Sequence, residues 1–223
     1  TSDFNAGGDL KYGVTPALTL DLTLLPDFAQ AEADEQQVNL TQFSQFFPEK
    51  RDFFLEASNF FTMGTGAAFT SSPVQTDLFF SRKIGLSDSG QPVPILGGAR
   101  LTGKVGKNNI AMLDVQTDSA FSKPGDNFFV SRYSRDVLGR SRVGAIFINK
   151  DSVDGSAHYN RTMGVDGNFS LGRNFQATGY VAKTLTNPDQ PWLNGQPHRD
   201  TASEPTRDAV QVFAFALMTF PIF

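Results

Sequence analysis

The chain has 223 residues and a formal net charge of −4, and no basic stripe runs along it, so its charge gives no reason to expect a nucleic-acid partner. It contains no cysteine, which excludes disulfides and thiolate metal sites. No apolar run approaches the ~20 residues of a membrane-spanning helix, but 22 phenylalanines and 20 glycines at 39% hydrophobic content are compatible with a membrane β-barrel, in which only alternate residues face lipid.

The first predicted element is a β-hairpin within residues 1–25. Between 18 and 24, leucine at every second position alternates with Thr19, Asp21 and Thr23. A strand turns successive side chains to opposite faces, so this segment presents one face of leucine and one polar face.

An acidic and Phe-rich insert is predicted over residues 26–76. Its first half carries four carboxylates within nine residues, at Asp27, Glu32, Asp34 and Glu35. Oxygen ligands of this kind suit calcium, but their spacing does not fit an EF-hand loop. The sequence therefore leaves open a weak metal site and a solvated or lumen-facing polar segment.

The second half of the insert contains the strongest helical signal in the chain. Phenylalanine pairs recur seven residues apart, close to two helical turns, so on a helix they would share one face. Pro48 suits the first position of a helix, and we predict a short helix over 48–58 with Phe53, Phe54 and Ala57 packed inward. The predicted aromatic face comprises Phe46, Phe47, Phe53, Phe54, Phe60 and Phe61.

We predict that this helix plugs a barrel lumen, since barrels of modest size fill their interior with side chains or inserts. The predicted charge cluster comprises Glu49, Lys50, Arg51 and Glu56, and these residues would pair with inward barrel charges such as Arg100, Lys104 and Asp114. Two alternatives stay open: a surface helix with solvated charges, and a catalytic pair of Glu49 and Glu56, for which no sugar-stacking aromatic is evident. No other catalytic group and no cofactor is predicted.

The remaining barrel strands are predicted within residues 77–223. Alternating apolar and polar residues place them at 77–84, 100–106, 109–117, 127–135, 142–150, 159–171, 175–183 and 209–223. In the clearest of them Tyr159, Met163 and Val165 share an apolar face, on which Arg161 is an exception near the strand end. Short and long connections alternate, and the connection at 184–208 is a very long loop with four prolines.

The alternation of connections favours an up-and-down barrel that has turns at one rim and loops at the other. A soluble β-sandwich has no need to keep such an alternation. The predicted strands are also close in length to a tilted membrane strand, which has about 9–11 residues. We therefore predict an all-β fold: an antiparallel up-and-down transmembrane β-barrel, complete or partial, with a short helical insert.

Several long segments resemble a bacterial family, the domain of unknown function 5916. They are GGDLKYGVTPALTLDLTLLPDFAQAEADEQQVNLTQFSQFFPEKRDFFLE (7–56), LFFSRKIG (78–85), PVPILGGARLTGKVGK (92–107), RDVLGRSRVGAIFINKD (135–151) and GVDGNFSLG (164–172). The resemblance spans roughly 7–184 and implies an outer-membrane barrel without a settled activity, although some members are labelled hydrolases. Members typically carry a family-9-like carbohydrate-binding domain upstream, and their barrels usually run longer, so we expect a small barrel or a piece of a larger one.

The predicted function is non-enzymatic. We expect a bacterial outer-membrane β-barrel protein that anchors an envelope domain or passes a solute, with outer-membrane lipid and other envelope subunits as partners. Carbohydrate would be bound through the upstream domain, which this sequence does not contain. The alternatives are a membrane-associated hydrolase acting at the barrel mouth and a soluble carbohydrate-binding β-sandwich.

Overall fold

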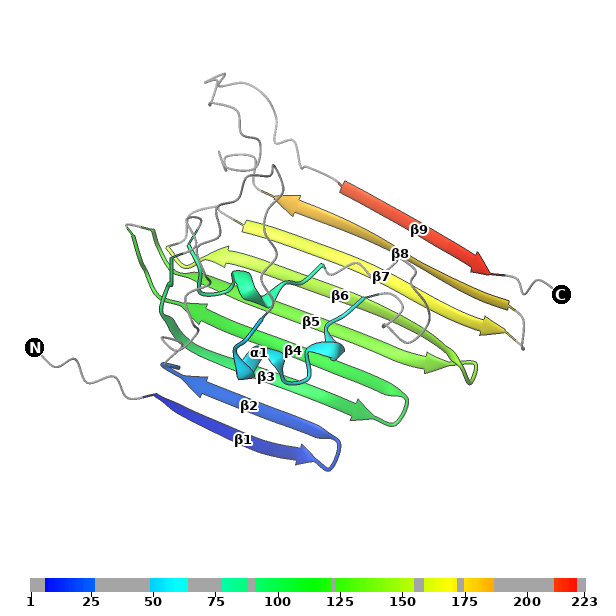
Figure 1. Ribbon diagram of the computed structural model, residues 1–223, viewed down its shortest axis with the longest axis horizontal. Coiled ribbons are helices and arrows are strands. Elements are labelled where there is room, and N and C mark those ends of the chain that lie inside the picture. The colour runs from blue at the N-terminus through cyan, green and yellow to red at the C-terminus, as the bar shows by residue number, and fades with distance from the viewer. Residues whose placement is uncertain are drawn as a thin grey trace, which may run out of the picture.

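The computed structural model describes residues 7–26, 49–63, 78–87, 91–121, 123–154, 159–171, 175–186 and 211–219. In these residues nine strands form a single antiparallel sheet, and each strand pairs with its neighbours in sequence (Figure 1). The strands are β1 (Gly8–Thr15), β2 (Leu18–Leu24), β3 (Ile95–Val105), β4 (Asn108–Thr117), β5 (Asp126–Val137), β6 (Ser141–Ser152), β7 (Tyr159–Leu171), β8 (Phe175–Thr186) and β9 (Gln211–Thr219). The helical elements are α1 (Asp52–Leu55) and two 3-10 helices, η2 (Ser58–Phe60) and η3 (Ser81–Lys83). The predicted antiparallel up-and-down order is confirmed.

Most predicted strands lie close to the observed ones. β7 has the predicted bounds, and β4, β5 and β6 differ from prediction by one or two residues at their ends. β3 begins five residues earlier than predicted, and β8 extends to Thr186, into the segment predicted as a loop over 184–208. The rest of that loop lies outside the described residues.

The predicted helix over 48–58 is wrong in extent. α1 has only four residues, and Ala57 adopts a left-handed conformation with φ of 59° before η2 begins. The side chain of Arg51, at the N-cap of α1, makes no capping hydrogen bond, because a guanidinium has no acceptor for a backbone N–H; it donates to Glu49 and to Ile84 O instead. Phe53 and Phe54 do pack toward the sheet, whereas Ala57 is only half-buried.

The strand predicted over 77–84 is also wrong. Residues 81–83 form η3, and this segment lies beside α1 on one face of the sheet rather than within it (Figure 1). The backbone oxygens of Ser81 and Ile84 accept hydrogen bonds from Arg51, so they are not available for a strand ladder. We call residues 49–63 and 78–87 the cover.

The two rims of the sheet differ as the sequence predicts. At one rim, short turns at 16–17, 106–107 and 138–140 join β1 to β2, β3 to β4 and β5 to β6. Gly106 and Gly139 adopt positive φ angles of 61° and 76°, which glycine tolerates without steric cost. The opposite rim receives the longer connections, including the 70-residue segment between β2 and β3 that contains the cover.

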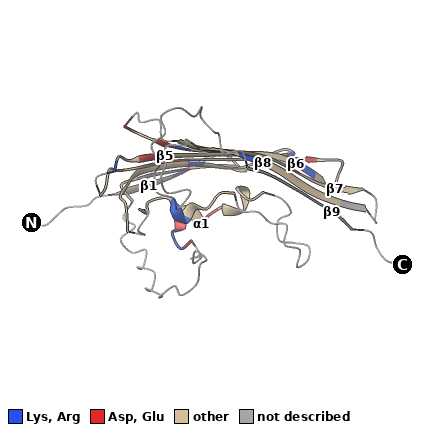
Figure 2. Cartoon of the chain, turned by 90° about the horizontal axis from the view of Figure 1, so that it is seen from above, with Lys and Arg blue, Asp and Glu red and all other residues tan. Residues whose placement is uncertain are grey.

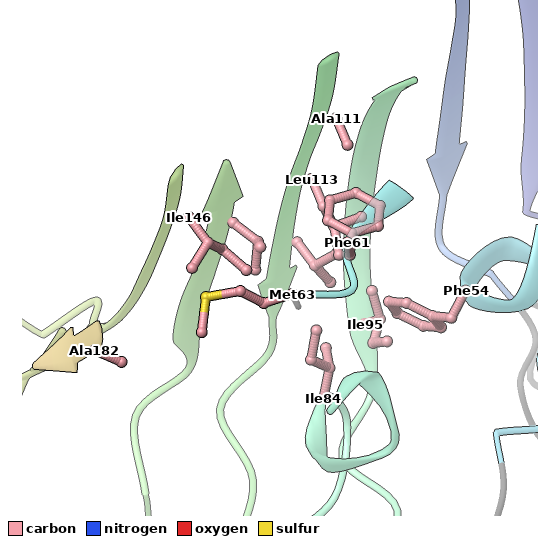
Figure 3. Close-up of a cluster of buried hydrophobic side chains, with 11 residues drawn as sticks. Phe54, Phe61, Met63, Ile84, Ile95, Ala111, Leu113, Ile146 and Ala182 are labelled. Carbon is pink, nitrogen blue, oxygen red and sulfur yellow. The ribbon is translucent and has the colours of Figure 1, made fainter. Parts of the chain in front are cut away.

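The cover packs against one face of the curved sheet, which we call the inner face (Figure 2). Phe54, Phe61, Met63 and Ile84 of the cover are buried against apolar residues of the strands (Figure 3). The strand residues of this core are Ile95, Ala111, Leu113, Val115, Val130, Ile146 and Ala182. Burial of apolar surface therefore holds the cover to the sheet.

Two inner-face glycines allow the cover to approach closely. A Cβ atom at Gly98 would lie 3.2 Å from Phe53 Cζ, and one at Gly164 would lie 3.0 Å from Met63 Sδ. A Cβ at either position would force the neighbouring Phe53 or Met63 side chain to shift by a few tenths of an ångström.

The described strands form an open sheet. β1 and β9 each pair on one side only, so closure into a barrel is not seen in these residues. All the described strands belong to this one sheet, which is not the two-sheet arrangement of the β-sandwich alternative. Among the described residues, no helix has the length and apolar character needed to cross a membrane.

Replacement of a core phenylalanine should loosen the fold. Phe61→Ala removes a buried ring and should lower the free energy of unfolding by about 3–5 kcal/mol. Leu55→Ala is the control, because Leu55 lies in the same cover but is exposed. Denaturant unfolding followed by circular dichroism measures both variants. Equal effects would contradict the packing described here.

Candidate functional site

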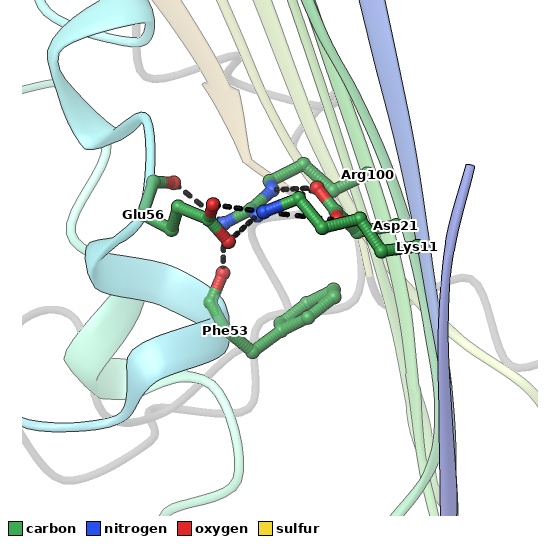
Figure 4. Close-up of polar contacts among 5 residues, drawn as sticks. All are labelled: Lys11, Asp21, Phe53, Glu56 and Arg100. Carbon is green, nitrogen blue, oxygen red and sulfur yellow. Dashed lines mark hydrogen bonds and ion pairs between the residues drawn. The ribbon is translucent and has the colours of Figure 1, made fainter. Parts of the chain in front are cut away.

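Arg100, a buried residue of β3, attaches the cover to the sheet. Its guanidinium donates to Asp21 Oδ2 on β2, from Nε at 3.2 Å and from Nη2 at 2.7 Å. It also donates to Glu56 Oε2 at 2.9 Å and to the backbone oxygens of Phe53 and Glu56. One planar group with several N–H donors thus joins two strands and the cover (Figure 4).

Lys11 of β1 completes this cluster. Its Nζ atom donates to Glu56 Oε1 and lies 3.8 Å from Asp21 Oδ1. We call Lys11, Asp21, Glu56 and Arg100 the latch. Its two cations and two carboxylates balance, which matters because the Arg100 side chain is only 2% exposed and a buried charge without a partner is strongly destabilising.

Glu56 is the latch residue that the cover contributes. The hydrogen bond from Lys11, followed by that from Arg100, holds the pKa of Glu56 below its usual value of 4.5. Its side chain is 55% exposed, so solvent screens its charge interactions. Glu56 therefore fixes the position of the cover more than it stabilises the fold.

A second ion pair holds the two parts of the cover together. Arg51 forms a bidentate pair with Glu49, with Nε–Oε1 and Nη2–Oε2 distances of 2.8 Å. The guanidinium also donates to Ile84 O at 2.7 Å and to Ser81 O at 2.9 Å. It lies over the Phe54 ring, 4.2 Å from the centroid. We call Glu49, Arg51 and Ser81 the clamp.

Glu49 is held in its ionised form within the clamp. Burial raises the pKa of Glu49, but the hydrogen bonds and charge of Arg51, with the Ser81 hydroxyl, outweigh burial and leave the pKa below its usual value of 4.5. Both side chains of the pair are less than a tenth exposed. The clamp is thus a buried, charge-assisted contact between segments 49–63 and 78–87.

The structure brings together part of the predicted charge cluster. The predicted contact of the insert with Arg100 is made by Glu56. Glu49 and Arg51 pair with each other instead of with strand charges, while Lys50 is exposed. The two other predicted strand partners are engaged elsewhere, Lys104 with Asp136 at 2.7 Å and Asp114 with Asn127 at 2.9 Å.

The predicted aromatic face is seen in part. Phe54 and Phe61 are buried in the core, and Phe53 and Phe60 pack against it. Phe46 and Phe47 lie outside the described residues, as do the weak metal candidates Asp27, Glu32, Asp34 and Glu35.

Three residues that matter here were not identified from the sequence. Lys11 was missed because its partner Glu56 is 45 positions away, and Asp21 because its partner Arg100 is 79 positions away. Asp21 does interrupt the threonines of the polar face, and this was a usable signal. Arg132 was also missed: its Nη1 atom lies 2.6 Å from Asp166 Oδ1 in a further buried pair, and a Cβ at Gly144 would come within 2.6 Å of that guanidinium.

The latch and the clamp suit attachment rather than catalysis. A glycosidase needs one carboxyl with a raised pKa to act as general acid, but the pKa values of Glu49 and Glu56 are both lowered. The described residues hold no cluster of three or more His, Cys, Asp or Glu side chains that would bind a metal. The arrangement instead fixes where the cover sits on the inner face.

Comparison with known proteins gives one finding. Residues 1–106 match the model of a family described as Domain of unknown function (DUF5916), which confirms the resemblance for this part of the chain. Searches of curated proteins and of solved structures returned no match.

Because of the clamp, the stability of the fold should depend on pH in the acidic range. Because the pKa of Glu49 is lower in the folded chain than when unfolded, its ionised form stabilises the fold above pH 4.5, and this contribution is lost as the pH falls below 4.5 through the folded value. Glu49→Gln should lower stability at pH 7, by about 1–3 kcal/mol, and reduce the further loss below pH 4.5.

Asp52→Asn is the control, because Asp52 is an exposed carboxylate of the same segment. Denaturant unfolding at pH 7 and at pH 3 measures all three proteins. If Glu49→Gln keeps the full acid dependence of the unchanged protein, the clamp does not hold the cover through its charge.

Proposed function

From the match of residues 1–106 to domain of unknown function 5916, we propose that this chain forms part or all of a bacterial outer-membrane β-barrel whose lumen is narrowed by the cover. The protein is non-enzymatic and serves the envelope as an anchor or as a path for a solute. Its outer face meets lipid, and its inner face meets the cover and water.

The distribution of charge on the outer face carries this proposal. The outer-face positions of β1 to β8 follow from the register, since paired residues share a face. The charged residues among them are Asp114, Arg135, Asp151, Arg161 and Lys183, and each lies within three residues of a strand end. The middle of the outer face is therefore free of charge, as a hydrocarbon layer requires.

Large apolar side chains are exposed on the outer face. Tyr12, Met112, Tyr133, Val165 and Val181 are each at least 41% exposed. In water such a surface would favour aggregation, since soluble monomers rarely expose wide apolar patches. Contact with lipid removes that cost.

The inner face has the opposite character away from the cover core. Its polar residues include Thr102, Ser134, Thr162, Thr178 and Thr186, all buried side chains that alternate with outer-face residues. Polar lumen positions and apolar lipid positions alternate in this way in outer-membrane barrels. Strands β3 to β8 have 10 to 13 residues, enough for a tilted crossing of about 9–11 residues.

The proposal requires that the two sheet edges be paired in the membrane. Each backbone group left unpaired in hydrocarbon costs several kcal/mol, so an open edge is not stable there. β1 and β9 therefore pair with further strands or with each other when the barrel is complete. The cover, held by the latch and the core, then lies inside the closed wall.

Channel measurements test the proposal. Glu56→Lys places a third cation beside Lys11 and Arg100, so repulsion should displace the cover and raise the conductance in planar bilayers several-fold. Asp52→Lys is the matched control, because it makes the same charge change at an exposed position in α1, four residues before Glu56. Its conductance should equal that of the unchanged protein.

Heat-modifiable gel migration of the same samples reports whether a barrel has formed. If migration changes on heating but Glu56→Lys leaves the conductance unchanged, then either the latch does not position the cover or the cover does not narrow the lumen. Migration that does not change, together with failure to insert into bilayers, would contradict the barrel itself.

A further inference from the structure

The short-turn rim carries an unusual concentration of positive charge. Five cationic side chains lie there in the β3–β4 and β5–β6 turn regions, together with one carboxylate, Asp136. We call these cations the basic rim, and they are Lys104, Lys107, Arg135, Arg140 and Arg142. All five are exposed, although the chain as a whole has a formal net charge of −4.

Strand pairing brings the two turns together. Asn108, just after the first turn, pairs with Arg135 on β5. The backbone N–H of Asp136 donates to Lys107 O at 2.9 Å, so the turns are in direct contact. The basic rim is one continuous patch rather than two separate turns.

The single carboxylate is already engaged. Asp136 Oδ2 lies 2.7 Å from Lys104 Nζ, and Asp136 Oδ1 accepts from Arg142 Nε at 2.7 Å. Within the described part of the chain, the side chains of Lys107, Arg135 and Arg140 have no acidic partner. Three cations therefore remain to meet an external anion.

The opposite rim is different. There two described cations of the strand ends face carboxylates, Lys150 with Asp126 at 2.9 Å and Arg161 with Asp151 at 3.3 Å, whereas Lys183 of β8 is exposed. Among the described residues, the group of five cations with a single carboxylate lies at the rim with short turns.

The apolar residues of the outer face continue up to the basic rim. Tyr133 and Val105 are exposed beside it, and Leu138 is 73% exposed in the second turn. Leu138 also has a φ of 47°, a conformation that leucine rarely adopts. An apolar surface that ends in a tyrosine and then in lysine and arginine matches the change from hydrocarbon to headgroups at a bilayer surface.

We propose that the basic rim binds the phosphate groups of anionic phospholipids in the leaflet at the short-turn side of the barrel, an inference that rests on the proposed membrane location. Arginine suits this ligand, because its guanidinium donates two parallel hydrogen bonds to phosphate oxygens. The nearby apolar side chains contact the acyl chains of the same lipid. The site thereby fixes the height and orientation of the barrel in the bilayer.

Lipid selectivity tests this inference. In vesicles of phosphatidylcholine, electron spin resonance compares the association of the protein with spin-labelled phosphatidylglycerol and with spin-labelled phosphatidylcholine. The unchanged protein should prefer phosphatidylglycerol, and Arg135→Gln/Arg140→Gln should reduce this preference by at least about fivefold, as expected from the loss of two cations near an anionic headgroup.

The matched control is Lys83→Gln/Lys123→Gln, which removes two exposed cations outside the basic rim, one in the cover and one at the opposite rim. Its lipid preference should equal that of the unchanged protein. Equal losses in both double variants would show a general charge effect and overturn the proposal, as would loss of the preference in a few millimolar inorganic phosphate at constant ionic strength.

Protease protection and heat-modifiable migration in pure phosphatidylcholine separate this inference from the proposed function. Protein that inserts normally but shows no preference for phosphatidylglycerol contradicts lipid binding at the basic rim and leaves the barrel intact. Protein that does not insert contradicts the barrel, and the lipid site with it.

Discussion

Strand geometry sends successive side chains to opposite faces of a sheet, and this constraint decides what each face of the protein must meet. This alternation places threonines, buried ion pairs and a patch of aliphatic residues around Leu113 on the inner face. On the outer face it delivers large apolar side chains, with charge only near the strand ends. The inner patch is covered by the chain itself, whereas nothing in the described residues covers the outer face.

The cover is held by two kinds of interaction with different roles. Burial of Phe54, Phe61, Met63 and Ile84 supplies most of the attraction, because it removes apolar surface from water. The latch decides where the cover sits, since Arg100 is buried and each of its donors needs an acceptor at a fixed place. A displaced cover would leave that charge with Asp21 alone. The charges of the latch therefore set the position of the cover, and apolar contact supplies most of the attraction that holds the cover to the sheet.

Local pattern was sufficient to predict the strands but not the cover. β7 was predicted to the residue because its alternation is long and has only Arg161, near the strand end, as an exception; the inward packing of Phe53 and Phe54 followed from their sequence context. The helix over 48–58 failed because the seven-residue spacing of phenylalanines also suits two short helices lying on one sheet. The strand over 77–84 failed because Arg51, some 30 residues away, binds its carbonyl groups. Contacts between distant segments, such as Lys11 with Glu56, leave no periodic trace in a sequence.

The central claim is that the outer face meets hydrocarbon while the inner face does not. Methyl NMR in lipid nanodiscs that contain a paramagnetic label deep in the acyl chains measures this directly. We expect strong broadening of the methyl signals of Leu20, Met112, Val165 and Val181, and little broadening of those of Leu113, Val130 and Ile146. Equal broadening of both groups, or stronger broadening of the second, would contradict the account.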